Sequence, residues 1–206
     1  MNSIENDMVK NVYEKIAPHF SNTRTYQWSW IIEFFDSLKD NSMVYDIGCG
    51  NGRNMTHNNL YFIGVDNCAN FLKICMDKKL AVVNSNITKI ALQDNTADAI
   101  ICIAVLHHLY TEENRLLALL EMKRLLKSGG KILLSVWSIN QPKKTRRSFK
   151  NYGNNIVLWN QYGEIYERYY YIFKIEELKS LFKKAGLIVI NYKYDCGNEI
   201  FTLMKL

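Results

Sequence analysis

A short apolar run that ends in three alternating glycines is the feature that most restricts the fold of this 206-residue chain. Residues 43–47 are typical of a buried strand, and Gly48, Gly50 and Gly52 follow at once. Glycine tolerates the backbone conformations of a sharp turn, and its missing side chain lets a ligand lie against bare peptide. The segment therefore predicts a strand, a tight turn and a ligand site at the carboxyl end of that strand.

Strand and helix patterns alternate along most of the chain, after two leading helices expected over residues 4–16 and 28–38. The expected strands are 43–47, 61–65, 81–83, 99–106, 131–137, 187–192 and 200–204, and the expected later helices are 71–79, 112–126 and 175–185. Residues 99–106 are apolar throughout, which suits a sheet covered on both faces. We expect an α/β fold whose mostly parallel sheet is closed by a terminal antiparallel hairpin around residues 195–198.

One long segment breaks this alternation. Residues 140–163 have no clean period and hold Pro142 and Gly153, so they are interpreted as an irregular excursion. We expect one domain over residues 1–206, with a helical cap at 1–40 and a substrate-side insertion at 138–170. The longest apolar run is too short to span a bilayer, and the N-terminus lacks the pattern of a secretory signal. These features predict an intracellular protein without membrane contact, in the cytoplasm, with nuclear presence left open.

The composition excludes some classes and leaves others open. Five cysteines are scattered without a Cys-x-x-Cys pair, which argues against a disulfide framework and against a zinc site, so no metal is expected. The net charge of +6, from 26 basic and 20 acidic residues, fits a polyanionic partner such as nucleic acid or an acidic membrane surface. A general excess of lysine, asparagine and isoleucine explains the same charge without any partner, so the placement of the charges carries more information than their sum.

An acidic residue after the second strand defines the expected ligand more closely. Asp66 follows Asp46 by twenty residues, and a carboxylate at that position can accept both hydroxyl groups of a ribose. The turn lacks the Gly-x-Gly-x-x-Gly spacing of a pyrophosphate cradle and the Gly-Lys-Ser/Thr ending of a P-loop. The predicted ligand is therefore adenosine-like, without a pyrophosphate.

This pattern, Asp-x-Gly-x-Gly-x-Gly followed by the distant acid, resembles the class I S-adenosylmethionine-dependent methyltransferases. The resemblance implies a Rossmann-like fold with a seven-stranded sheet and S-adenosylmethionine as the cofactor. It also implies that Gly48 and Gly50 face the cofactor, that Asp46 anchors its amino-acid end and that Asp66 holds its ribose. The remaining residues that the resemblance assigns to the cofactor are Asn51, Asn86 and Ala104.

At a finer level the chain resembles the eukaryotic tRNA methyltransferases that esterify 5-carboxymethyluridine at the wobble position. The segments that carry this resemblance, besides the glycine turn, are residues 12–24 (Val-Tyr-Glu-Lys-Ile-Ala-Pro-His-Phe-Ser-Asn-Thr-Arg), 103–108 with Thr111 and Arg115, 168–170 (Arg-Tyr-Tyr) and 195–198. An Ala-Pro-His-Phe-Ser-x-Thr-Arg segment and a double histidine after the fourth strand are not general features of methyltransferases.

The chemistry of that family suggests roles for these residues. Its nucleophile is a carboxylate, which is already ionised at pH 7 and needs orientation rather than a general base. Arg24 is the expected cation, because a guanidinium matches carboxylate or phosphate geometry, although a solvated loop arginine is the plain alternative. His107 and His108 complete the catalytic prediction; at least one is expected to face the substrate, and the other can equally be a packed histidine. The predicted substrate-binding residues are Arg115, Arg146, Arg147, Arg168, Tyr169, Tyr170 and Asn198.

Several positions depart from the family pattern. Asn86 stands where an acid is expected to accept from the adenine amino group, and an amide oxygen can still accept that hydrogen bond. Leu109 replaces an aromatic residue, Tyr171 a histidine and Glu199 a tryptophan. These departures lie near the expected substrate side and bear on the identity of the substrate.

Partners are predicted from charge and from the resemblance. Residues 140–163 hold five cations and no acid, with aromatic residues between them, which suits the backbone and unstacked bases of a tRNA anticodon loop; a solvated loop is the alternative. The resembled enzymes act as heterodimers with a small zinc-binding activator, which by analogy docks on the edge strand at residues 81–84.

Two other functions remain open at this point. A methyltransferase for a quinone or lipid precursor would carry an apolar lid in place of the basic residues 143–150. The departures at Asn86 and Glu199 leave open a catalytically silent cofactor-binding subunit.

Overall fold

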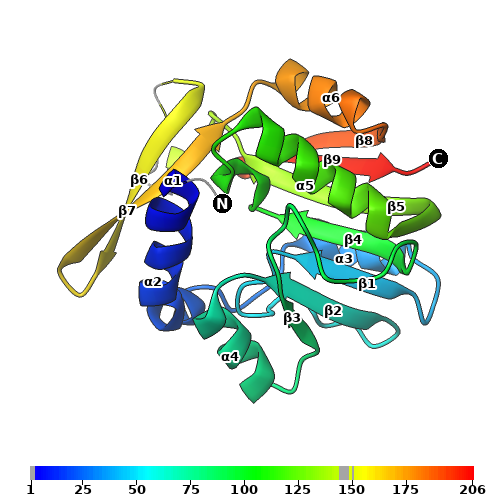
Figure 1. Cartoon of the computed structure of the whole chain (residues 1–206), viewed down its shortest axis with the longest axis horizontal. Helices are drawn as coiled ribbons and strands as arrows, with labels where there is room; N and C mark the ends of the chain where they lie inside the picture. Colours follow the sequence, from blue (N-terminus) through cyan, green and yellow to red (C-terminus); the bar gives the residue numbers. More distant parts are fainter. Residues whose placement is uncertain (1–2, 144–148, 150) are drawn as a thin grey trace.

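The computed structural model describes residues 3–143, 149 and 151–206 (Figure 1). Seven strands form one sheet in the order β3-β2-β1-β4-β5-β9-β8. The bounds of these strands are Met43–Ile47 (β1), Tyr61–Asp66 (β2), Val82–Asn84 (β3), Ala97–Ile103 (β4), Leu126–Trp137 (β5), Ile188–Asp195 (β8) and Asn198–Met204 (β9). The first five run parallel to their neighbours, whereas β9 pairs antiparallel with both β5 and β8, so the predicted Rossmann-like methyltransferase sheet is confirmed.

The strand order explains where a ligand can bind. The chain moves outward from β1 through β2 to β3, and then returns to the other side of β1 with β4. Parallel sheets bind ligands at such a reversal, outside the carboxyl ends of the strands. The buried β4 lies beside β1, with Val44 level with Ala99 and Asp46 level with Ile101, so the glycine turn stands at this point.

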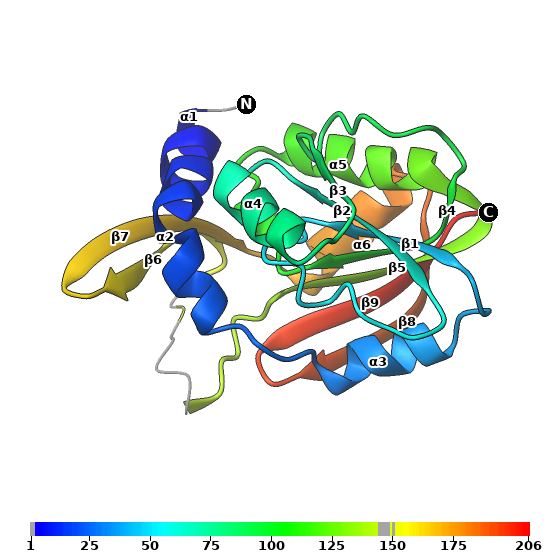
Figure 2. The ribbon, with the colours of Figure 1, turned by 90° about the horizontal axis from the view of Figure 1, so that it is seen from below.

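Helices cover both faces of the sheet, as the apolar β4 predicts (Figure 2). The helix α3 (Ser29–Asp36) packs Trp30, Ile31 and Phe35 on one face. The helices α5 (Glu112–Leu125) and α6 (Ile175–Lys184) pack on the other, and α4 (Ala69–Asp77) follows β2. The helix α3, which lies within the helical cap expected at residues 1–40, thus packs directly on the sheet. No helix in the described part of the chain is long and apolar enough to cross a membrane.

The first helical segment is longer than the sequence pattern predicts. It runs through α1 (Ser3–Glu5), the π-helix η1 (Asn6–Lys10) and α2 (Asn11–Asn22), with Pro18 inside α2. Proline has no N–H to donate to the carbonyl four residues earlier, which is that of Glu14. Asn70 Nδ2 donates to this carbonyl instead, at 2.7 Å, and the Glu14 carboxylate accepts from the first N–H groups of α4, on Ala69 and Asn70. The proline therefore docks α2 on α4 rather than ending the helix.

A second correction concerns residues 140–163, of which 153–163 are not irregular. Strand β6 (Gly153–Gln161) pairs antiparallel with β7 (Glu164–Ile172) in a separate two-stranded sheet beside α2 (Figure 1). The loop between them is the pair Tyr162 and Gly163, with φ of 54° and 96°, as a tight hairpin turn of the type I′ kind requires. Residues alternate between exposed and half-buried along β6, a two-residue period that the polar composition of the segment hides.

Candidate active site

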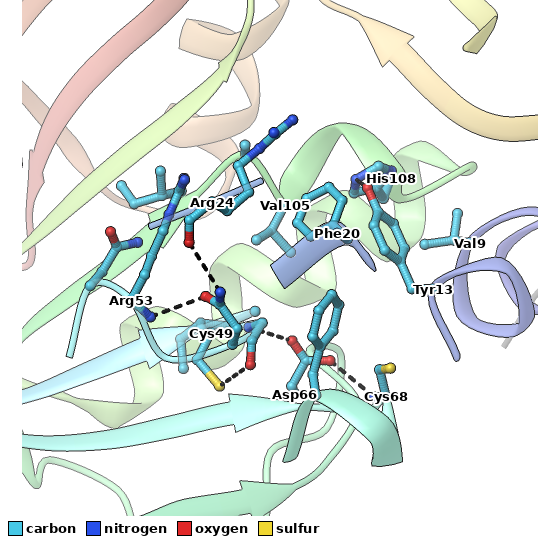
Figure 3. A pocket seen from close by; sticks show the side chains of 18 of the residues that line it. Val9, Tyr13, Phe20, Arg24, Cys49, Arg53, Asp66, Cys68, Val105 and His108 are labelled. Carbon is cyan, nitrogen blue, oxygen red and sulfur yellow. Dashed lines mark hydrogen bonds between the residues drawn. The ribbon is translucent and has the colours of Figure 1, made fainter. Parts of the chain in front are cut away.

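A cavity of about 400 Å³ lies at the carboxyl ends of β1, β2 and β4, a size usual for small-ligand sites (Figure 3). Its walls come from segments far apart in the sequence: η1 and α2, the loop at residues 23–28, the glycine turn, the end of β2, the segment after β4, and the turn between β8 and β9. The fold thus brings the N-terminal motif, the glycine turn and the C-terminal turn together.

The glycine turn serves packing at one position and ligand access at another. Gly48 (φ 77°) donates its N–H to the Val65 carbonyl at 2.7 Å, and a Cβ on it would lie 2.3 Å from Cγ2 of Val105. Gly50 (φ 53°) lines the cavity, and a Cβ on it would meet no atom within 4 Å. Gly48 is therefore required by the packing of the turn against Val105, whereas Gly50 leaves bare backbone facing the ligand space.

Asp66 is held by the turn that it faces. Its Oδ2 accepts from the N–H of Gly50 and its Oδ1 from the N–H of Cys68, both at 2.9 Å. Burial raises the pKa of this carboxyl, and these backbone donors oppose the rise. Each carboxylate oxygen can accept more than one hydrogen bond, so both remain able to accept from hydroxyl groups of a ligand in the cavity.

Asp46 is a buried acid behind the turn, one residue before the cavity wall. Its Oδ2 has no hydrogen-bond partner in the described part of the chain. Burial, followed by the nearby Asp66 charge, raises the pKa of Asp46 to about 7, and Arg53 opposes the rise. A buried carboxylate without a partner is costly, so this position is suited to a cationic or hydrogen-bond-donating group.

We expect this acid to make the ligand-free protein less stable as the pH rises. The folded pKa of Asp46 exceeds the ordinary value of 3.8, so its contribution is full below about pH 4 and is lost as the pH rises through about 7. Each pKa unit corresponds to about 1.4 kcal/mol, so this one group can remove roughly 4 kcal/mol from the free energy of unfolding. Chemical denaturation at pH 5 and pH 8 should show roughly 2.6 kcal/mol of this loss in the wild type, because part of it falls below pH 5, and a smaller loss in Asp46→Asn. Equal losses in the two proteins would contradict the assignment.

Asn86 and Ala104 both line the cavity, but the side-chain oxygen of Asn86 is not free to accept from the cofactor as predicted. Asn86 Oδ1 already accepts from the N–H of Thr88 at 2.9 Å and from its hydroxyl at 3.0 Å, which uses both lone pairs of the oxygen. The expected acceptor for an adenine amino group is therefore occupied, and the amide Nδ2 is the group that remains for a ligand. Ala104 follows β4 with φ of 60° and donates its N–H to the Ser135 carbonyl.

Asn51, predicted to bind the cofactor, also fastens the loop that carries Arg24. Its Nδ2 donates to the carbonyl of Arg24 at 3.1 Å, and its Oδ1 accepts from the N–H of Arg53 at 3.2 Å (Figure 3). A lysine, Lys78, donates to the Asn51 carbonyl at 2.8 Å. One side chain thus joins the glycine turn to the loop at residues 23–28.

The two histidines separate into one that packs and one that lines the cavity. His107 is fully buried in η2 (Leu106–His108), and its Nδ1 accepts from the N–H of Trp137 at 3.1 Å. His108 lines the cavity, donating from Nδ1 to the Tyr169 carbonyl at 2.9 Å and accepting at Nε2 from the Tyr13 hydroxyl at 3.2 Å. Burial lowers the pKa of His108 to about 3, so its ring is neutral at physiological pH, and both of its nitrogens are already hydrogen-bonded within the protein.

Three arginines surround the substrate side of the cavity. Arg24, from the loop at residues 23–28, and Arg53, which follows the glycine turn, line the cavity and extend in a similar direction (Figure 3). Arg168 lies just behind the wall residues Tyr13 and Tyr170. None of the three forms an ion pair with an acid in the described part of the chain, although Arg168 is only 3% exposed. Burial lowers the pKa of Arg24 and Arg53. A buried cation without a counter-ion is costly, so the arrangement is suited to an anionic ligand.

Aromatic rings hold Arg24 and Arg168 in place. The guanidinium of Arg24 lies 4.8 Å from the ring centre of Phe20, and that of Arg168 lies 5.0 Å from the ring centre of Trp159. Arg168 also donates to the hydroxyls of Tyr170 at 3.0 Å and Tyr13 at 3.4 Å. Rings fix the planar cations while leaving their N–H groups for a ligand.

Of the predicted substrate residues, Tyr170 and Asn198 line the cavity, and Tyr169 and Arg115 do not. Tyr169 is buried, with its hydroxyl donating to Asn154. Arg115 is 3% exposed, donates to the carbonyls of Leu109 and Tyr110, and stacks on Tyr171 at 3.4 Å. Arg115 therefore fixes the start of α5 and lies outside the lining of the cavity. The positions predicted at Arg146 and Arg147 lie outside the described residues.

The sequence prediction missed Tyr13 and Arg53. Tyr13 joins α2 to His108 and to Tyr170, because its hydroxyl lies 3.2 Å from Nε2 of His108 and 3.2 Å from the hydroxyl of Tyr170. Tyr13 belongs to the N-terminal motif at residues 12–24, and this membership is the sequence signal that could have indicated it. Arg53 follows the last glycine of the turn, and its place in the cavity wall marks it as a ligand-facing cation.

The domain region and the fold match those of known enzymes. The family described as Methyltransferase domain matches residues 45–134. A methyltransferase from Methanosarcina mazei has a TM-score of 0.71 at 18% identity, covering 84% of this chain and 97% of that one. A Haloferax volcanii methyltransferase solved with the Trm112 activator has a TM-score of 0.70 at 14% identity, covering 95% and 96%. At these identities the likeness shows the fold.

Together, the fold and the site define an S-adenosylmethionine-dependent methyltransferase. A tRNA (carboxymethyluridine(34)-5-O)-methyltransferase from Schizosaccharomyces pombe is 36% identical over 94% of both chains. The enzyme of that name from Arabidopsis thaliana is 42% identical over 67% of this chain and 34% of its own. The chain belongs to the tRNA (carboxymethyluridine(34)-5-O)-methyltransferase family. It spans about a quarter of the relative named ALKBH8 from Macaca fascicularis, which is 40% identical over 73% of this chain.

Proposed function

We propose that this chain transfers a methyl group from S-adenosylmethionine to the carboxylate of 5-carboxymethyluridine at position 34 of tRNA, forming the methyl ester. The observation that carries the proposal is the group of three arginines beside the cofactor turn, which form no ion pair within the described residues. A neutral quinone or lipid precursor would leave these cations uncompensated. The curated relatives bear the name of this reaction.

The residues of the cavity fit the cofactor. Asp66 and the bare backbone at Gly50 would receive the ribose, and the unpartnered Oδ2 of Asp46 would receive, directly or through water, the amino-acid end. Asn86, Ala104 and Asn51 complete the walls. When bound, S-adenosylmethionine supplies a sulfonium methyl group to the carboxylate oxygen, with cleavage of the bond between carbon and sulfur. The buried acids and the cationic cofactor are complementary in charge.

The residues around the substrate orient it and take no proton from it. The substrate carboxyl is ionised at pH 7, so its oxygen is a nucleophile without a general base. Arg24 and Arg53 orient this group, and Arg168 supports it from behind the tyrosines. His108, neutral and held by Tyr13, packs beside the substrate and leaves the carboxylate charged. Orientation of the two reacting groups and exclusion of water then provide the rate enhancement.

RNA is the macromolecular substrate in this proposal. Residues 140–163 contain five cations and no acid, and such segments bind phosphates through charge. The residues Arg146 and Arg147 are proposed to contact the anticodon loop, and the tRNA substrate is consistent with a cytoplasmic location.

A small activator protein, zinc-binding in the resembled enzymes, is proposed as a partner on strand β3. This strand ends the seven-stranded sheet, so one side of it is free to pair with a strand of another chain. Met76 on the neighbouring α4 and Tyr61 at the start of β2 are exposed apolar residues. The complex of a Haloferax volcanii methyltransferase with the Trm112 activator supports this kind of assembly.

The test incubates the chain, with and without an activator of the Trm112 kind, with tRNA carrying 5-carboxymethyluridine and methyl-labelled S-adenosylmethionine. We expect label in the tRNA that mild alkali releases, because esters hydrolyse in base and methylated bases and riboses do not. Bound cofactor without label in the tRNA would support a silent subunit. Label in a free metabolite alone would support a small-molecule methyltransferase, and either outcome would overturn the proposal.

A further inference from the structure

The seam between α2 and the β6–β7 hairpin holds polar atoms that nothing in the described chain satisfies. Buried atoms without a hydrogen-bond partner are Nδ1 of His19, Nε1 of Trp159, Oε1 of Gln161 and Nε of Arg168. Trp159, Gln161 and Arg168 lie on the hairpin face that turns toward α2, and the ring of His19 lies 5.4 Å from that of Trp159. Buried donors and acceptors are normally paired, so such a group at one seam indicates a ligand contact.

The same seam carries a continuous row of aromatic rings. Tyr162 stands at the hairpin turn, 85% exposed, with its ring centre 4.8 Å from that of His19. The row continues from His19 to Trp159 and then to Phe20, whose ring centre is 5.4 Å from Trp159 and which lines the cavity. The row, defined as Tyr162, His19, Trp159 and Phe20, is called the aromatic row below. It leads from the hairpin turn to the proposed substrate site.

Cations accompany this row. Arg24 and Arg168 lie over Trp159, and the exposed Lys15 lies 6.0 Å from the ring centre of Tyr166 on the same hairpin face. The acid near the turn, Glu164, accepts from the hydroxyl of Tyr166. The opposite face of the hairpin differs, because Ile156, Leu158 and Ile165 are exposed there. Rings and cations together suit unstacked bases and phosphates, whereas the apolar face does not.

We propose that the aromatic row binds an unpaired nucleotide that flanks the target nucleotide of the RNA. Its base stacks on Tyr162 and His19, and its phosphate lies near Lys15. This inference rests on the proposed function, because the cavity at the end of the row is taken as the site of the target nucleotide. The row reaches that cavity through Phe20, so adjacent nucleotides of one strand can occupy the two places.

The test measures binding of an anticodon stem-loop carrying 5-carboxymethyluridine, in the presence of S-adenosylhomocysteine, by fluorescence anisotropy. Tyr162→Ala should weaken binding about 5- to 150-fold, the range for stacking of one base on an aromatic ring, and Tyr162→Phe should stay within about 2-fold. Lys15→Ala should reduce the slope of log affinity against log salt concentration by about one, the change expected for the loss of one phosphate contact. The matched control is Ile165→Ala, a 62% exposed position on the other face of the hairpin, which should have no effect.

The outcomes separate the two proposals. Equal affinity of Tyr162→Ala and wild type, with methylation of the tRNA intact, would overturn the aromatic row alone. Weaker binding in Tyr162→Ala and Ile165→Ala alike would also overturn it, because a general disturbance of the hairpin would then be the cause. Loss of binding in Tyr162→Ala without any methylation by the wild type would support the row as an RNA contact and overturn the proposed reaction.

Discussion

Replacement of Arg24 by alanine should lower kcat/KM for the carboxymethyl tRNA about 100- to 1000-fold, the effect usual for loss of one preorganised donor to a reacting oxygen. The guanidinium lies on Phe20, and the described structure gives its N–H groups no acid to bind, only the hydroxyl and carbonyl of Thr23. It is therefore ready for a substrate carboxylate. Single-turnover rates with labelled cofactor measure the change.

Two comparisons make the Arg24 prediction specific. The affinity for S-adenosylhomocysteine should stay within about 2-fold in Arg24→Ala, because charge on the substrate side does not hold the cofactor. Arg24→Lys should recover only part of the rate, since lysine keeps the charge and loses the planar fork. Turnover equal to wild type in Arg24→Ala would remove this arginine from the site.

Alanine at Gly48 should mainly lower the stability of the fold, whereas alanine at Gly50 should mainly weaken cofactor binding. At Gly48 the methyl group would lie 2.3 Å from Cγ2 of Val105 on a left-handed backbone, so we expect a loss of roughly 3 kcal/mol in the free energy of unfolding. At Gly50 the methyl group would enter open space, so only the backbone cost of about 1 kcal/mol applies. The same methyl group would occupy the ligand space and weaken cofactor binding. Chemical denaturation and calorimetric titration with S-adenosylhomocysteine separate the two effects.

Gly129 provides the matched control for Gly50. It has a φ of 75°, a Cβ on it would meet nothing within 4 Å, and it lies away from the cavity. Gly129→Ala should therefore cost similar stability and leave cofactor affinity unchanged. Equal cofactor affinity in Gly50→Ala and Gly129→Ala would show that Gly50 does not face the ligand.

The sheet could be predicted because its signals are local and periodic. Apolar runs and the glycine turn mark β1, β2 and β4, and the turn at residues 195–198 marks the terminal hairpin. The β6–β7 hairpin was not predicted, because its strands contain many asparagine and tyrosine residues and so lack a clear alternation of apolar and polar side chains. Its turn, Tyr162-Gly163, is also not one of the common hairpin-turn pairs. The apolar spacing predicted a helix only as far as residue 16, whereas α2 continues through Pro18, where Asn70 donates to the carbonyl that the proline leaves unpaired within the helix.

The site was predicted in outline and corrected in its partners. His107 and His108 are adjacent and of one type, so only the path of the chain decides which lines the cavity. The oxygen of Asn86 is taken by Thr88 two residues on, a local turn that the strand pattern did not indicate. Arg115 lies in a recognised motif, yet its partners are two carbonyls, the ring of Tyr171 and the carboxylate of Glu177. Motifs indicate which residues matter, and contacts decide what each one does.

The central claim is that the substrate is a carboxylate held by arginines at the cofactor turn. The most direct measurement compares methyl transfer to two tRNAs that differ only at nucleoside 34, one with 5-carboxymethyluridine and one with the neutral 5-carbamoylmethyluridine. We predict alkali-labile label on the acid and none on the amide, with S-adenosylmethionine bound equally in both reactions. Equal labelling of the two tRNAs, or alkali-stable label on either, would contradict the claim.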